Sequence, residues 1–301
     1  MTKIKKPGEI SVDALMRVLF YGQPGVGKST LALSMPSPLM IDCDRGVHRV
    51  APEHLSDTVQ VDSWMDVEET LNEDLSDYQT VIFDTAGKLL DFMGDHIVKV
   101  NPKMSRGQGQ LTLQGYGVRK AMFRGLLTKL FVMKKHVVFV AHEREDKDGE
   151  DRFIRPEIGG SSGADLIKEL DLVGYLEMFG KRRVVHFQPQ DKFYAKNGLR
   201  LEPTLEIPDA ANGNVFMMTI LDAQSRIAGE RQEMLRQYHD LIELVKSNVS
   251  DCKDAESLND VVDWAKSVNH IWDSKMQAAK RIKAKANDLG LSFDKEAGTY
   301  K

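Results

Sequence analysis

The chain has 301 residues, of which 42% are hydrophobic and 29% are charged, and its formal net charge is −4. This composition is typical of a globular protein, and it excludes wholesale disorder and a protein that coats nucleic acid by bulk positive charge. Two cysteines are too few for a disulfide framework or a zinc site. Because no long apolar run and no signal-peptide pattern is present, we expect a soluble, cytoplasmic protein that makes no contact with a membrane.

Apolar, β-prone runs alternate with segments of helical spacing through the first half of the chain. Strands are predicted at 17–21, 39–44, 57–62, 78–85 and 136–143, and helices after residue 27 and at 64–75, 86–99 and 116–134. Continuous apolar strands that alternate with helices predict an α/β fold, with a mostly parallel twisted sheet and helices on both of its faces.

The sequence changes character after residue 143. Residues 144–165 are charged and then rich in glycine and serine, which predicts a long mobile loop. Residues 172–188 predict an antiparallel hairpin at one edge of the sheet, with its turn near Gly180. Amphipathic helices are predicted at 223–248, 255–268 and 270–288. We therefore predict an α/β core at 1–221 and a helical C-terminal extension at 222–301.

The most specific motif is Gly-x-x-x-x-Gly-Lys-Ser, which follows the first predicted strand and precedes a helix. In this P-loop the glycines let backbone amides converge on phosphates at the helix N-terminus. Lys28 would pair with the β- and γ-phosphates of ATP, and the Ser29 hydroxyl would ligate Mg²⁺. The predicted nucleotide-binding residues are Gly22, Gln23, Pro24, Gly25, Val26, Gly27, Lys28, Ser29 and Thr30.

Carboxylates follow two of the other predicted strands. Asp84 ends the apolar run TVIFD, the arrangement of a Walker B aspartate that holds Mg²⁺; the alternative is a helix N-cap. Asp44, in MIDCDRGV, is the candidate general base or water-positioning group, and its alternative is an exposed loop carboxylate. Asp42 is expected to be structural.

His142 ends the fifth predicted strand and is expected to face the γ-phosphate, with a capping or surface histidine as the alternative. Glu143 is a rival to Asp44 for water activation. Strand candidates between the P-loop and Asp84 predict that another strand separates the P-loop strand from the Walker B strand, as in the additional-strand ATPases rather than in the kinases and GTPases.

These motifs, in this order, resemble the RecA-like recombinase core over residues 15–210, and specifically the phage RecA-like single-strand annealing (Sak) group. The resemblance is carried by GQPGVGKST, MIDCDRG, TVIFDT, VVFVAHE, LIKELDLVGYLE and DKFYAKNGLRLEP. Three features depart from recombinases. Asp44 stands where they carry glutamate, His142 stands where they carry glutamine, and no N-terminal polymerisation segment is evident.

The resemblance implies an ATPase stimulated by single-stranded DNA that promotes annealing or strand pairing in phage recombination. It implies a homo-oligomer in the cytoplasm of a bacterial host, and a single-stranded DNA-binding protein as a possible partner. The candidate DNA contacts are Lys103, Arg106, Arg152, Arg155, Lys181, Arg182 and Arg183. Lys192 and Lys196 would reach the ATP of a neighbouring subunit, with a solvated strand edge as the alternative.

The candidate DNA-binding loops are residues 101–117 and residues 143–163. Charge in the second loop opposes this interpretation, because it holds four basic and seven acidic side chains. A solvated loop is the plainer reading of that charge run. The alternative function is a nucleotide-switched adaptor that recruits replication or recombination partners through its C-terminal helices, with little direct contact to DNA.

Overall fold

The computed structural model describes residues 15–301 except 108–109, 149–150, 160–161 and 210–213. The chain divides into two compact units between Gln224 and Ser225, close to the domain boundary predicted after residue 221. The first unit carries the sheet and the P-loop, and the second unit is helical.

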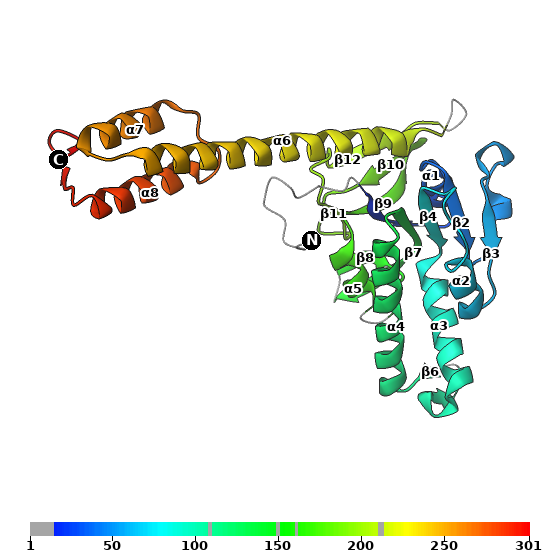
Figure 1. Cartoon of the computed structure of the whole chain (residues 1–301). Coiled ribbons are helices and arrows are strands. Elements are labelled where there is room, and N and C mark those ends of the chain that lie inside the picture. Colours follow the sequence, from blue (N-terminus) through cyan, green and yellow to red (C-terminus); the bar gives the residue numbers. More distant parts are fainter. Residues whose placement is uncertain (1–14, 108–109, 149–150, 160–161, 210–213) are drawn as a thin grey trace. The chain divides into compact units, whose positions relative to one another are not determined.

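One mixed sheet organises the first unit, with its strands in the order β12–β10–β9–β1–β7–β4–β2–β3 (Figure 1). All neighbours from β9 to β3 are parallel, and β10 and β12 add an antiparallel edge, which confirms the predicted fold class. The strands of this path are β1 (Arg17–Gly22), β2 (Pro38–Asp42), β3 (Thr58–Gln60), β4 (Thr80–Asp84), β7 (His136–Asp148), β9 (Leu172–Phe179), β10 (Arg182–His186) and β12 (Thr204–Ile207). The short β11 (Lys196–Asn197) pairs with β9.

Alternating side chains of the strands divide the core into two layers, because successive residues point to opposite faces of a sheet. Val18 and Phe20 of β1 pack with the P-loop helix, whereas Leu19 and Tyr21 pack on the other face. The first layer is covered by α1 (Lys28–Ala32) and the start of α6 (Phe216–Asp251), and the second by α2 (Trp64–Thr70), α3 (Ala86–Val100), α4 (Leu113–Val132) and α5 (Ser162–Glu169).

Helices α3 and α4 lie side by side and extend away from the sheet (Figure 1). Between them in the chain come the short strands β5 (Ser105–Gly107) and β6 (Gln110–Leu111), which pair with each other. We call residues 99–116, where α3 ends and α4 begins, the α3–α4 tip. It includes residues 101–116 of the first candidate DNA-binding loop.

The second unit has a small core of its own. Helix α6 runs on into it and is followed by α7 (Ala255–Ser267) and α8 (Ser274–Asp288). Val245, Leu258 and Ile282 bring the three helices together. A short pair of strands, β13 (Phe293–Asp294) and β14 (Thr299–Tyr300), ends the chain. The three amphipathic helices that the sequence predicts are therefore present.

The prediction of a long loop after residue 143 is wrong. Strand β7 continues to Asp148 and pairs with β8 (Asp151–Pro156) in an antiparallel ribbon. Charges of opposite sign stabilise this ribbon where a loop was expected, since Arg152 lies 3.1 Å from Glu145 and Arg155 lies 3.1 Å from Asp146.

The prediction that one strand separates the P-loop strand from the Walker B strand is confirmed, but that strand is β7. Strand β2, which corresponds to the predicted strand at 39–44, lies on the far side of β4. The order of the strands along the chain did not reveal which strand lies between β1 and β4, because β7 comes after Asp84 in the sequence.

Packing around Gly174 of β9 yields a stability prediction. A Cβ atom added there would lie 2.7 Å from Val185 Cγ2 and 3.0 Å from atoms of Phe20 and Phe187. Gly174→Ala should therefore lower the free energy of unfolding by about 1–3 kcal/mol. The matched control is Gly117→Ala in α4, where no atom lies within 4 Å of the added Cβ and alanine favours the helix. Urea denaturation followed by circular dichroism measures the stability of both variants. Equal denaturation midpoints for Gly174→Ala and the wild type would contradict the prediction.

Candidate nucleotide-binding site

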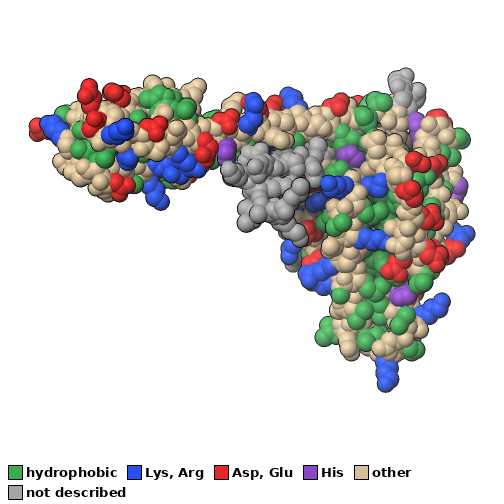
Figure 2. Space-filling model, viewed as in Figure 1, with side chains coloured by type: hydrophobic (Ala, Val, Ile, Leu, Met, Phe, Trp, Pro, Cys, Tyr) green, Lys and Arg blue, Asp and Glu red, His purple; other side chains and the backbone are tan. Residues whose placement is uncertain are grey.

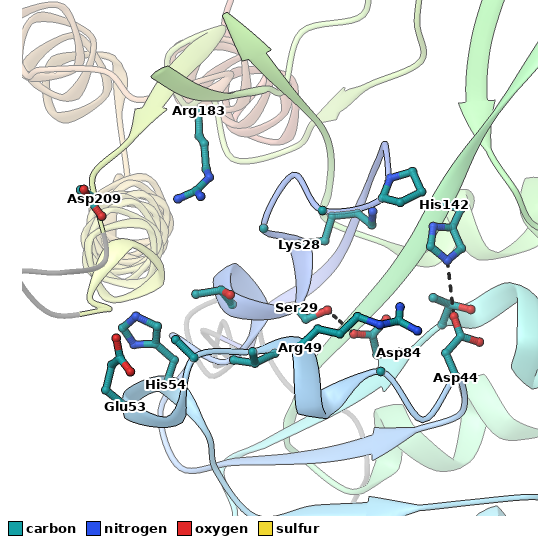
Figure 3. A pocket seen from close by; sticks show the side chains of 18 residues that line it. Lys28, Ser29, Asp44, Arg49, Glu53, His54, Asp84, His142, Arg183 and Asp209 are labelled. Carbon is teal, nitrogen blue, oxygen red and sulfur yellow. Dashed lines mark hydrogen bonds and ion pairs between the residues drawn. The ribbon is translucent and has the colours of Figure 1, made fainter. Parts of the chain in front are cut away.

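The parallel register brings the chemically important residues to one edge of the sheet. Gly22 of β1 is in register with His142 of β7, and Asp42 of β2 is in register with Asp84 of β4. A cavity of about 440 Å³ lies at this edge, and Figure 3 shows the side chains around it. Because ligands of parallel α/β sheets bind at the carboxyl ends of the strands, this cavity is the candidate site.

Two positions of the P-loop require glycine, one because of a close neighbour and one because of its backbone conformation. A Cβ on Gly22 would lie 2.2 Å from the carbonyl oxygen of Leu176 in the neighbouring strand β9. Gly27 has a φ of 98° and is the N-cap of α1, a left-handed conformation that favours glycine. Pro24, Gly25, Gly27, Lys28, Ser29 and Thr30 line the cavity. The other predicted residues of the motif do not, and Val26 is buried in the core.

The Lys28 side chain is held by the loop that it follows. Its ammonium group donates hydrogen bonds to the carbonyl oxygens of Gly22 at 2.9 Å and Gln23 at 2.7 Å, and the residue is only 6% exposed. Burial lowers the pKa of Lys28, while the carboxylates of Asp84, Glu143 and Asp44 act in the opposite direction. Lys28 is thus a positioned cation at the floor of the cavity.

Ser29 and Asp84 meet as the metal prediction requires. The Ser29 hydroxyl donates a 2.5 Å hydrogen bond to Oδ2 of Asp84. The N-cap alternative for Asp84 is wrong, because Thr85 caps α3 through a hydrogen bond from the Lys88 amide. Burial raises the pKa of Asp84, with the nearby carboxylates Asp44 and Asp42 adding to the effect. A bound cation would offset this cost.

The donor set around Ser29 suits Mg²⁺. A hydroxyl and a carboxylate oxygen are ligands that this ion accepts, and Mg²⁺ in nucleotide sites takes its remaining ligands from phosphates and water. Within the described residues no group of three or more His, Cys, Asp or Glu side chains is placed to hold a metal ion. A site that needs the nucleotide to complete the coordination is consistent with both findings.

The two aspartates after β2 have different surroundings. Asp42 is 1% exposed, and its two carboxylate oxygens accept hydrogen bonds at 3.0 Å from the amides of Gly46 and Val47. Asp42 therefore fixes the loop. Asp44 lines the cavity, and its Oδ2 lies 3.4 Å from Nε2 of His142. Of the two, only Asp44 is placed to meet a water molecule beside a bound nucleotide.

His142 and Glu143 are neighbours with different access to the cavity. His142 lines it, whereas Glu143 is not among the lining residues. Nδ1 of His142 and Oε2 of Glu143 are buried and have no hydrogen-bond partner in the described part of the chain. The geometry therefore favours Asp44 over Glu143 as the water-activating group, although that role stays a prediction.

Other candidate residues are engaged elsewhere in the first unit. Arg182 pairs with Glu206 at 3.2 Å. The Lys196 ammonium donates to the carbonyl oxygens of Ile167, Lys168 and Leu170 at the C-terminus of α5, an intramolecular capping role. The predicted contacts of Lys192 and Lys196 with a neighbouring subunit stay predictions, as does a DNA contact of Lys181.

Sequence reasoning missed one side of the cavity. Arg183, predicted to contact DNA, instead lines the cavity (Figure 3). Arg49, Glu53, His54 and Asp209 line it too and were not singled out. The first three follow Asp44 within ten residues, and that proximity was the available indication. Nothing in the local sequence marked Asp209, because the fold brings it from beyond β12.

The fold and the site define a P-loop ATPase. A family model described as an AAA domain matches residues 14–199, so the chain belongs to that family. Among solved structures, the flagellar accessory protein FlaH from Methanocaldococcus jannaschii is similar at 10% sequence identity and a TM-score of 0.36, over 66% of this chain and 87% of that one. No curated protein matches the chain.

The similarity to FlaH carries no argument about what this chain binds. The finer resemblance to the phage annealing group stays a prediction. None of the described helices is both long and apolar enough to cross a membrane.

The site separates nucleotide binding from turnover in a testable way. Asp44→Asn should lower the kcat for ATP by about 100- to 10,000-fold and leave ATP affinity nearly unchanged, because it removes a base and no predicted phosphate contact. Lys28→Ala should lose both ATP binding and ATP hydrolysis. Asp42→Asn, the same chemical change two residues away, should lower the melting temperature instead. Phosphate release and titration with a fluorescent ATP analogue measure the two properties. Equal kcat values for Asp44→Asn and the wild type would exclude the role of Asp44.

Proposed function

We propose that this protein binds ATP and Mg²⁺ in the P-loop cavity, hydrolyses ATP, and binds single-stranded DNA with the α3–α4 tip. Annealing or strand pairing in phage recombination is the process that such an activity would serve. Lys28, Ser29 and Asp84 would hold the nucleotide and the metal, and Asp44 and His142 would face the γ-phosphate. The proposed assembly is a homo-oligomer that works beside a single-stranded DNA-binding protein.

The observation that carries the DNA proposal is the charge of one segment. From His96 to His142 the chain contains nine lysines and arginines and no aspartate or glutamate. This segment therefore has a formal net charge of +9 in a chain whose overall net charge is −4. A local basic surface on an acidic protein is what binding to a polyanion requires.

Several of these cations are used inside the fold. Lys120 and Arg124 pair with Asp165, and Lys135 donates to carbonyl oxygens of Leu75 and Tyr78. Of the other six, Lys129 donates to Asn72, Arg119 is buried, and Lys134 is exposed beyond the C-terminal end of α4. The last three are at the α3–α4 tip. There Lys99, Lys103 and Arg106 are exposed and form no ion pair with another described residue.

Apolar side chains accompany the charge at the tip. Leu113 is 80% exposed and Tyr116 is 43% exposed, and the Arg119 guanidinium lies 4.9 Å from the centroid of the Tyr116 ring. In Figure 2 the lower end of the first unit shows basic and hydrophobic side chains together. Cations for the backbone and an exposed ring for base stacking are the two components of a surface that binds single strands.

Helix α3 supplies a physical link between this tip and the nucleotide. It begins at Ala86, two residues after Asp84, and ends at Val100, where the tip begins. A metal ion bound at Asp84 would therefore act on the N-terminus of the helix whose other end carries the basic surface. A change in the position of one end of a rigid helix is transmitted to the other.

A second function is favoured by the β7–β8 ribbon. Asp146 lies within ion-pair distance of both Arg144 and Arg155, so the second candidate DNA-binding region neutralises its own cations. The second unit meanwhile exposes Trp272 and Met276. An adaptor that recruits protein partners through that unit would show these features. A chain ending at Gln224 should then lose partner binding, whereas DNA binding by the tip should survive.

Reversing charge at the tip tests the proposal. Replacing Lys103 and Arg106 with glutamate should lower affinity for a fluorescent oligothymidylate by about 100-fold or more and flatten its salt dependence, since two phosphate contacts are lost and two repulsions gained. Fluorescence anisotropy at several salt concentrations, with ATP and with ADP, measures this.

Lys134→Glu is the matched control for Lys103→Glu alone, because Lys134 is exposed in the same acid-free segment just beyond the other end of α4. It should bind DNA nearly as the wild type does. Equal losses of DNA affinity in both variants would show that the effect depends on net charge and not on the position of the cation. No ATP-dependent difference in DNA affinity of the wild type would exclude the coupled function.

A further inference from the structure

Among the described residues that line the P-loop cavity, Arg183 is the one lysine or arginine besides Lys28 and Arg49. It comes from β10, at the antiparallel edge of the sheet, and not from the strands that carry the motifs. We propose that Arg183 binds a phosphate of the nucleotide held in the same chain, so that the β9–β10 hairpin completes the site in cis. This inference rests on the proposed nucleotide binding.

The register of β10 determines where Arg183 points. Val185 and Phe187, two and four residues further on, are fully buried in the layer of the core that contains the P-loop helix. Arg183 has the same parity as these residues and therefore faces the same side, past the end of the buried layer. Arg182 has the opposite parity and pairs with Glu206.

Distances place the Arg183 side chain on the P-loop itself. A Cβ built on Gly27 would lie 3.5 Å from Nε and 3.9 Å from Cζ of Arg183. Gly27 is the N-cap of α1. The P-loop motif would place a phosphate of the nucleotide against the backbone amides there. A guanidinium at that point adds a planar, always charged donor to the amides that already favour phosphate.

The side of the cavity on which Arg183 lies indicates which phosphate it meets. In Figure 3 Asp44 and His142 lie on one side of Lys28 and Ser29, and Arg183 lies on the other. The pair Asp44 and His142 is the candidate γ-phosphate side. Arg183 therefore faces a phosphate that ADP and ATP share, and its role is in binding both nucleotides and not in sensing hydrolysis.

Nucleotide titrations of the full chain test the assignment. Arg183→Ala should weaken binding of fluorescent ADP and ATP analogues to the same extent, by about 10- to 100-fold, which is the worth of a hydrogen bond to a charged group. Arg183→Lys, which keeps the charge without the fork, should recover part of this loss. The matched control is Arg182→Ala, one residue away on the opposite face, which should bind as the wild type does.

Mixing the two variants that bind nucleotide poorly, Lys28→Ala and Arg183→Ala, separates a site completed in cis from one completed by a neighbour. Lys28→Ala protein retains Arg183, and Arg183→Ala protein retains Lys28. In the cis arrangement their mixture should bind no more tightly than Arg183→Ala alone, whereas recovery of wild-type affinity would overturn the assignment in cis.

Three further results are decisive. Equal nucleotide affinity of Arg183→Ala and the wild type, with matched melting temperatures, would overturn the role of Arg183 alone. A loss confined to ATP would overturn its assignment to a shared phosphate. A wild type that binds neither nucleotide would overturn the proposed function together with this inference.

Discussion

The site depends on the parallel register of four strands, β2, β4, β7 and β1. Backbone hydrogen bonds between buried strands fix this register, and a slip of one residue would turn every core side chain to the wrong face. Because the register is fixed, Asp42, Asp84 and Gly22 at the ends of their strands meet His142, which lies within β7, at one edge. The site is thus a consequence of the apolar core beneath it, with loops contributing the side chains that complete it.

Electrostatics at this edge is unfavourable without a ligand. Asp84 is half-buried beside other carboxylates, and Lys28 is buried, with backbone carbonyl oxygens as its hydrogen-bond acceptors in the described part of the chain. Burial raises the pKa of Asp84 and lowers the pKa of Lys28, and both shifts favour the neutral form of the side chain. Charged groups held at such a cost mark a functional site more often than a stabilising one. A metal ion beside Asp84 and phosphates beside Lys28 are the ligands that would offset both costs.

Charge is distributed unevenly outside the site, and the fold explains how. The β7–β8 ribbon pairs its own cations and anions across the strands. The segment from His96 to His142 holds no acidic residue, and its tip leaves cations exposed next to apolar side chains. A count of charges in the two candidate loops could compare their composition, but only strand pairing shows which of the cations are already neutralised.

The sequence alone determined the P-loop, the alternation of strands and helices and the carboxylate at the end of β4, because these depend on local patterns: glycines at fixed spacing, continuous apolar runs and a polar residue at a strand end. Tertiary structure decided the rest. It separated Asp42, which fixes a loop, from Asp44, which lines the cavity, and it made a ribbon of the predicted loop after His142. It also placed Arg183, which the sequence predicted to contact DNA, beside the P-loop. Each of these outcomes depends on pairing between segments distant in the chain, and such pairing leaves no local pattern.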